Sequence, residues 1–166
     1  ARGRPLEEGG GVGGSAEIGS EARAPSPPHL QHLQERIERG DPLSRQDLAP
    51  LQAYARAHPN DPTGHLLLAH AFTDLEWHSA AIERYVQAYQ ADAAAAEDPR
   101  VLENLMALLP HPELHAPAAR AIGLLYGSAA VEPLERFLSE ADLPWVEHRR
   151  VLEFLERLKT RRKRER

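Results

Sequence analysis

The sequence predicts an all-α protein, built as a stack of antiparallel helix pairs behind a disordered N-terminal linker. From His29 onward, apolar residues recur at intervals of three or four rather than two, which is the spacing of one helix face. β-branched residues are too few and too scattered to form strands. Capping residues, prolines and glycines interrupt this pattern often, so we expect several short helices joined by short turns.

Residues 1–28 form the expected linker. This segment contains the run Gly9-Gly10-Gly11-Val12-Gly13-Gly14 and then Pro25-Ser26-Pro27-Pro28, with few large apolar side chains between them. Such a composition favours disorder. Three of the glycines have the spacing of a dinucleotide-binding motif, but that motif needs a strand before it and a helix after it, and the sequence predicts neither.

Each predicted helix has an apolar face and a start or stop signal. The apolar faces lie within residues 30–37, 48–54, 67–75, 81–89, 101–109, 114–125, 131–138 and 145–158. The signals are capping Ser or Asp residues, Asp-Pro steps, and Gly or Pro residues that end a helix: Gly40, Ser44 with Asp47, Pro59, Asp61-Pro62, Asp98-Pro99, Pro110, Gly127, Ser128 and Asp142. In the last helix, the expected core-facing residues are Trp145, Val151, Leu152, Phe154, Leu155 and Leu158.

Composition supports a modest core and excludes several chemistries. The 166 residues are 42% hydrophobic but only 5% aromatic, so alanine and leucine must supply most of the packing. The absence of cysteine excludes disulfides, thiolate metal sites and a cysteine nucleophile. No apolar run is long enough for a membrane span, and we expect a cytoplasmic protein. Because the chain begins with Ala1 rather than Met, we also expect a fragment or a processed form.

Residues 62–92 carry the clearest internal pattern. Counted from Pro62, the residues at the key positions of a unit of about 34 residues are Leu68, Ala69, Phe72, Ala81, Tyr85 and Ala88. This pattern resembles a tetratricopeptide repeat. The resemblance implies that the small residues lie where two paired helices touch, that the larger ones fill the gap to the next pair, and that successive pairs form a right-handed α-solenoid. His65 replaces the usual Trp and Ala93 the closing Pro.

The second half of the chain departs from this period. Residues 99–158 resemble HEAT-type repeats, chiefly through segments 119–125 and 129–134. The order of a Gly/Pro-rich linker, a tetratricopeptide-like pair and a HEAT-like end is similar to C-terminal regions of bacterial serine/threonine protein kinases. This resemblance implies a larger parent protein, although the chain itself contains no kinase motif.

No group of residues indicates a reaction, a metal or a cofactor. His29 with His32, and His111 with His115, could each place two imidazoles on one helix face, but no third ligand follows at a fixed spacing. Ser79 lacks the glycine-flanked turn that exposes a hydrolase serine. We therefore predict a protein that is not an enzyme, with no metal and no cofactor.

The tetratricopeptide resemblance predicts a protein-interaction module. In that family the first helix of each pair lines the hollow side of the stack, which implies the peptide-groove candidates Thr63, Leu66, His70, Thr73 and Asp74. The Lys and Asn residues that clamp a terminal carboxylate in some members are absent from these positions. The partner would be a protein or peptide segment. A purely structural role, in which the helices support an upstream domain, is an alternative of equal weight. Self-association is also expected, because the ends of a short stack expose apolar side chains.

The C-terminal residues 159–166 form a basic tail on a chain whose net charge is −5. Its cations are Lys159, Arg161, Arg162, Lys163, Arg164 and Arg166. Clustered cations bind phosphates, so the second hypothesis is a nucleic-acid-binding accessory protein that uses this tail alone. The simpler interpretation is that like charges fray the last helix and keep it soluble. No membrane partner is predicted.

Overall fold

The computed structural model describes residues 27–164, and the regular structure in this part of the chain is entirely helical. Its elements are α1 (Pro28–Glu38), α2 (Arg45–Ala57), α3 (Pro62–Asp74), α4 (His78–Ala91), the 3₁₀ helix η1 (Ala93–Glu97), α5 (Pro99–Leu108), α6 (His115–Leu125), the 3₁₀ helix η2 (Gly127–Ala130), α7 (Val131–Glu140) and α8 (Trp145–Arg164). The all-α prediction is confirmed for these residues. The predicted linker lies outside the described residues, apart from Pro27 and from Pro28, which begins α1.

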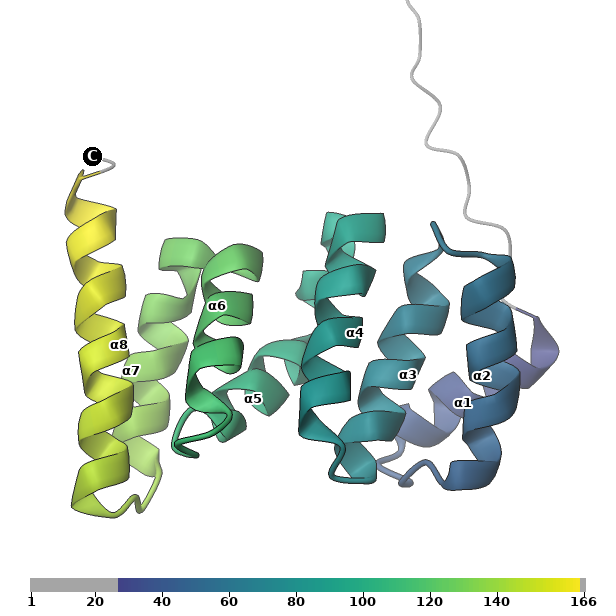
Figure 1. The fold of residues 1–166 in the computed structure, drawn as a ribbon, viewed down its shortest axis with the longest axis horizontal. Coiled ribbons are helices and arrows are strands. Elements are labelled where there is room, and N and C mark those ends of the chain that lie inside the picture. The colour runs from purple at the N-terminus through teal and green to yellow at the C-terminus, as the bar shows by residue number, and fades with distance from the viewer. Residues whose placement is uncertain (1–26, 165–166) are drawn as a thin grey trace, which may run out of the picture.

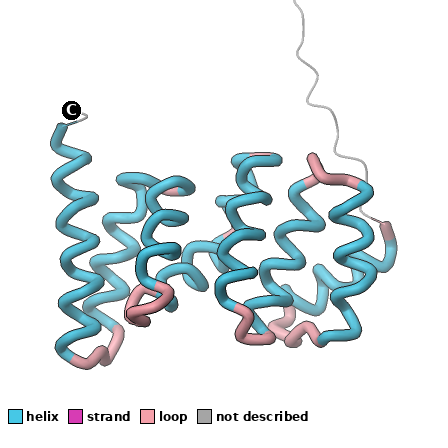
Figure 2. The backbone as a smooth tube through the Cα atoms, viewed as in Figure 1, coloured by secondary structure: helices cyan, strands magenta, loops and turns pink. Residues whose placement is uncertain are grey.

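The helices follow one another in chain order along the long axis of the molecule (Figure 1). Helices α2, α3, α4, α6 and α8 stand side by side with similar axis directions, whereas α5 runs across them. The tube view shows that the connections are short loops at the helix ends (Figure 2). Helix α3 packs against both α2 and α4, α6 packs against α4 and α5, and α7 packs against α8.

Local signals set most helix ends where the sequence predicts them. The carboxylates of Asp61 and Asp98 accept backbone N–H groups two residues on, at 2.9 and 3.0 Å, and so cap α3 and α5. At the start of α2, the Asp47 carboxylate accepts the N–H and the hydroxyl of Ser44 at 2.7 and 3.0 Å. Gly40 ends α1 with φ +80°, a conformation that glycine adopts without steric cost.

Three expectations for the C-terminal half are wrong. Ser128 does not cap α7, because it lies inside η2 and its carbonyl accepts the N–H of Val131 as the chain passes directly into the helix. Trp145 and Leu152 do not face the core and are 71% and 39% exposed. They share one face of α8, roughly half a turn from the buried Phe154. The tail does not fray within the described residues, because α8 continues to Arg164.

The core is tightest around α3, which is buried on almost every side. Ala69 and Ala81 are 0% and 1% exposed in the α3–α4 pair, which allows the two helices to approach closely. Gly64 likewise allows α3 to approach α2 closely. A Cβ at this position would lie 2.9 Å from Cδ1 of Tyr54 and 3.1 Å from Cα of Ala55. None of the described helices combines the length and apolarity that crossing a membrane requires.

Candidate functional site

His70 lies at the centre of a hydrogen-bonded cluster that joins α3, α4 and α5. Its Nε2 donates to Oδ2 of Asp98 at 3.1 Å, and its Nδ1 lies 3.0 Å from the Tyr85 hydroxyl. The Tyr85 hydroxyl also accepts from Nδ2 of Asn104 at 2.7 Å and lies 3.3 Å from Oγ1 of Thr73. Because His70 is 5% and Tyr85 1% exposed, these polar groups are satisfied by one another rather than by solvent.

The electrostatics of this cluster favour an ionised Asp98 and a neutral Tyr85. Burial raises the pKa of Asp98, but hydrogen bonds from the His70 side chain and the Arg100 N–H outweigh burial and leave the pKa below its ordinary value of 3.8. Burial raises the pKa of Tyr85 to about 12, although its contacts with Thr73 and Asn104 act to lower it. Both ring nitrogens of His70 are hydrogen-bonded to protein groups, so the orientation of the imidazole is fixed.

A groove of about 290 Å³ lies beside this cluster, where α1, α3 and the start of α5 meet. We call it the α1–α3–α5 groove, and its lining residues are Gln34, Ile37, Glu38, Leu66, Leu67, His70, Asp98, Pro99 and Arg100. The half-buried Ile37 and Leu66 supply apolar surface, and Glu38 and Arg100 supply opposite charges. The groove thus offers both apolar contact and polar anchoring, as ligand sites generally do.

The structure brings only two of the five predicted groove residues into this lining, namely Leu66 and His70. The other three have positions that serve the fold. Thr63 is 8% exposed at the start of α3, Thr73 donates its hydroxyl to the Ala69 carbonyl, and Asp74 accepts the Leu43 N–H at 2.7 Å. Sequence reasoning missed the residues that α1 and α5 contribute, although Ile37 belongs to a periodic apolar face and Pro99 follows a recognised cap.

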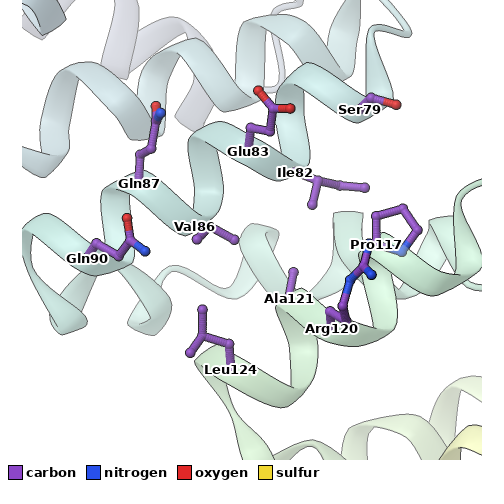
Figure 3. A pocket seen from close by; sticks show the side chains of 10 residues that line it. All are labelled: Ser79, Ile82, Glu83, Val86, Gln87, Gln90, Pro117, Arg120, Ala121 and Leu124. Carbon is purple, nitrogen blue, oxygen red and sulfur yellow. The ribbon is translucent and has the colours of Figure 1, made fainter.

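Two larger grooves flank α6 on another part of the molecule. The α4–α6 groove, of about 550 Å³, is lined by side chains of α4 that face Pro117, Arg120, Ala121 and Leu124 of α6 (Figure 3). The α6–α8 groove, of about 740 Å³, is lined by His115, Ala116, Ala119, Arg120, Gly123, Leu124, Phe154, Arg157, Leu158 and Arg161. Arg120 and Leu124 belong to both, so the two grooves adjoin along α6. No local pattern in the sequence predicts either groove, because each is lined by helices that are not consecutive in the chain.

One of the cations at the basic end of α8, Lys159, forms ion pairs within the fold. Nζ of Lys159 lies 2.8 Å from Oε1 of Glu135 on α7 and 3.3 Å from Oε1 of Glu156. Lys163 and Arg164 are exposed, and Arg162 is half-buried. Arg166 lies outside the described residues. The last described turns of α8 therefore present cations on an ordered helix.

The histidine pairs do not converge with other ligands. His29 and His32 are exposed on α1, and His115 places Nδ1 2.8 Å from the Leu109 carbonyl. Within residues 27–164, no three side chains of His, Asp or Glu lie together in a way that could hold a metal ion.

Comparisons with known proteins returned nothing: no protein-family model matches the chain, and neither a curated protein nor a solved structure is significantly similar to it.

Proposed function

We propose that this chain is a non-catalytic protein-interaction module of stacked helix pairs, in which the α1–α3–α5 groove holds a peptide segment of a partner protein. The observation that carries the proposal is the position of the groove. It is formed by three helices, and one wall is the His70 imidazole, fixed by Asp98 and Tyr85. A wall that is already ordered loses little conformational entropy when a ligand binds.

The packing of α3 and α4 supports the stacked-pair part of this proposal. Ala69 and Ala81 are fully or almost fully buried, as the tetratricopeptide resemblance implies for the positions where paired helices touch. Leu68 and Tyr85, at two of the positions for larger residues, are buried as well. Under the proposal the helices from α1 to α8 form a right-handed α-solenoid within a larger protein, and the kinase resemblance implies that its upstream part is a kinase domain.

The chemistry of the groove favours binding over catalysis. Both nitrogens of His70 are hydrogen-bonded to protein groups, so the ring has no free nitrogen with which to move a substrate proton. The remaining lining offers apolar contact from Ile37 and Leu66 and hydrogen-bonding groups from Gln34 and Arg100. These groups suit a short peptide with one apolar anchor.

A selection experiment tests this function. Peptides from a displayed random library would be selected on the full chain and then measured against Leu66→Glu. We expect Leu66→Glu to weaken binding of the selected peptides by about tenfold or more, because it places a charge among apolar contacts. The matched control is Leu124→Glu, which alters an apolar side chain on α6 that is 52% exposed and outside this groove. Equal loss in both variants, or no loss in either with an intact fold, would overturn the proposal.

The second candidate function, nucleic-acid binding through the tail, is favoured by the ordered basic turns at the end of α8. Titration with a nucleic acid at two salt concentrations, before and after deletion of residues 159–166, tests it. Salt-sensitive binding that disappears with the deletion would support this function. Binding that survives the deletion, or no binding at all, would remove it.

A further inference from the structure

We propose that the α6–α8 groove is a second docking surface, which binds an acidic amphipathic helix of a partner protein. This surface is separate from the α1–α3–α5 groove, because the two share no lining residue. The proposal rests on three features of the groove: the spacing of its apolar residues, its charge, and the space above Gly123.

The apolar lining has the spacing that another helix requires. Ala116, Ala119 and Gly123 follow one face of α6 at intervals of three and four, and Phe154 and Leu158 follow one face of α8 at an interval of four. Rows of this kind form ridges and grooves into which the side chains of a third helix fit. Leu124, 52% exposed, extends the apolar surface into the adjoining α4–α6 groove, where Ile82 and Val86 continue it (Figure 3).

The charge of the groove is of one sign. Among the residues that the structure describes, Arg120, Arg157 and Arg161 line it, and no carboxylate does. Within residues 27–164, Arg120 and Arg157 form no ion pair.

Two carboxylates of α8, Glu153 and Glu156, are paired outside the groove. Glu153 binds Arg149 at 2.9 Å and Glu156 binds Lys159 at 3.3 Å, and neither glutamate lines the groove. On a chain whose net charge is −5, a groove whose described lining holds arginines and no acid is complementary to a partner that brings carboxylates.

Gly123 provides a way to block the groove without disturbing the core. A Cβ at this position meets no atom within 4 Å. A large side chain here would therefore enter the groove rather than the packed interior. Gly123→Phe is the blocking variant, and Gly123→Ala is its matched control. Arg157→Glu tests the charge, with Arg136→Glu on the exposed side of α7 as its control.

The experiment uses the full chain and a fluorescently labelled synthetic helix, with leucines at alternating intervals of three and four and glutamates elsewhere. A second peptide carries lysine in place of every glutamate. We expect the acidic peptide to bind the wild type, as measured by fluorescence anisotropy, and the lysine peptide to bind about tenfold or more weakly. Gly123→Phe and Arg157→Glu should each weaken binding of the acidic peptide by about tenfold or more. Gly123→Ala, Arg136→Glu and Leu66→Glu should retain it, and circular dichroism of every variant should match the wild type.

Three results would overturn this inference. The first is equal binding of the acidic and lysine peptides, or wild-type affinity in both Gly123→Phe and Arg157→Glu. The second is tighter binding of an RNA oligonucleotide that displaces the acidic peptide and is lost in Arg157→Glu. The third is a wild-type dimer in sedimentation that Arg157→Glu dissociates, since the groove would then hold a second copy. Leu66→Glu separates this inference from the proposed function. This variant should lose binding of peptides to the α1–α3–α5 groove and keep binding of the acidic helix to the α6–α8 groove.

Discussion

Nε2 of His70 lies 3.1 Å from Oδ2 of Asp98, and this hydrogen bond ties the middle of α3 to the residue that caps α5. Asp98 therefore has two functions at once. Its Oδ1 accepts the Arg100 N–H at the start of α5, and its Oδ2 satisfies a buried imidazole. The shape of the α1–α3–α5 groove depends on this pair, since both residues line it.

Replacing Asp98 by Ala should lower the free energy of unfolding by about 2–4 kcal/mol, because a helix cap is lost and the buried His70 Nε2 loses its acceptor. Urea denaturation measures the change. Asp92→Ala is the matched control: it removes the residue whose carboxylate caps η1 by accepting the Ala94 N–H, and should cost about 1 kcal/mol. An equal loss in the two variants would show that the bond to His70 contributes nothing.

The low pKa of Asp98 predicts a loss of stability in acid. Because the pKa is lower in the folded state than the ordinary value of 3.8, the ionised carboxylate stabilises the fold above that value. This contribution is lost as the pH falls through the folded-state pKa. Unfolding free energies measured from about pH 6 to about pH 3 should therefore fall more steeply for the wild type than for Asp98→Asn. Parallel curves would contradict the assignment.

Two glycines on different helices should respond in opposite ways to alanine. Gly64→Ala forces a methyl group against Tyr54 and the backbone of Ala55, so we expect a loss of about 1–3 kcal/mol. Gly123→Ala meets open space and gains helix propensity, so we expect a gain of about 0.5–1 kcal/mol. Thermal and urea unfolding of both variants check this pair. A stabilised Gly64→Ala would mean that α2 and α3 are not in close contact.

Glu76 is held in a left-handed conformation, with φ 61°, at the end of α3. Trp77 donates its N–H to the Phe72 carbonyl at 2.8 Å, and its indole packs on the Phe72 ring. These contacts complete a Schellman motif. Glu76→Gly should therefore raise the free energy of unfolding by about 1 kcal/mol. Glu83→Gly, in the exposed interior of α4, should lower it by about 1 kcal/mol. The same sign in both variants would contradict the geometry.

The helices could be predicted because their signals are local. The cap at Asp61 acts on the N–H of Thr63, only two residues away, and Gly40 ends α1 through its own backbone angle. The exceptions have tertiary causes. Trp145 belongs to the apolar pattern of α8, yet no helix within residues 27–164 covers its face. The Arg149 guanidinium lies over its ring instead, 5.5 Å from the ring centroid.

The candidate site could be predicted only in part. Leu66 and His70 were predicted through the tetratricopeptide resemblance, which implies that the first helix of a pair lines the hollow side of the stack, and both line the groove. The bonds of His70 to Asp98 and of Tyr85 to Asn104 link residues 28 and 19 positions apart, and no local spacing encodes such contacts. The same holds for the charge of the α6–α8 groove, which depends on how two separate helices face each other.

The most direct test of the central claim is a nuclear magnetic resonance titration of the full chain with a peptide selected from the displayed library. We expect the largest backbone amide shifts at Ile37, Leu66 and Arg100, which are groove residues contributed by α1, α3 and α5. The largest shifts on other helices, with these three amides unmoved, would contradict it.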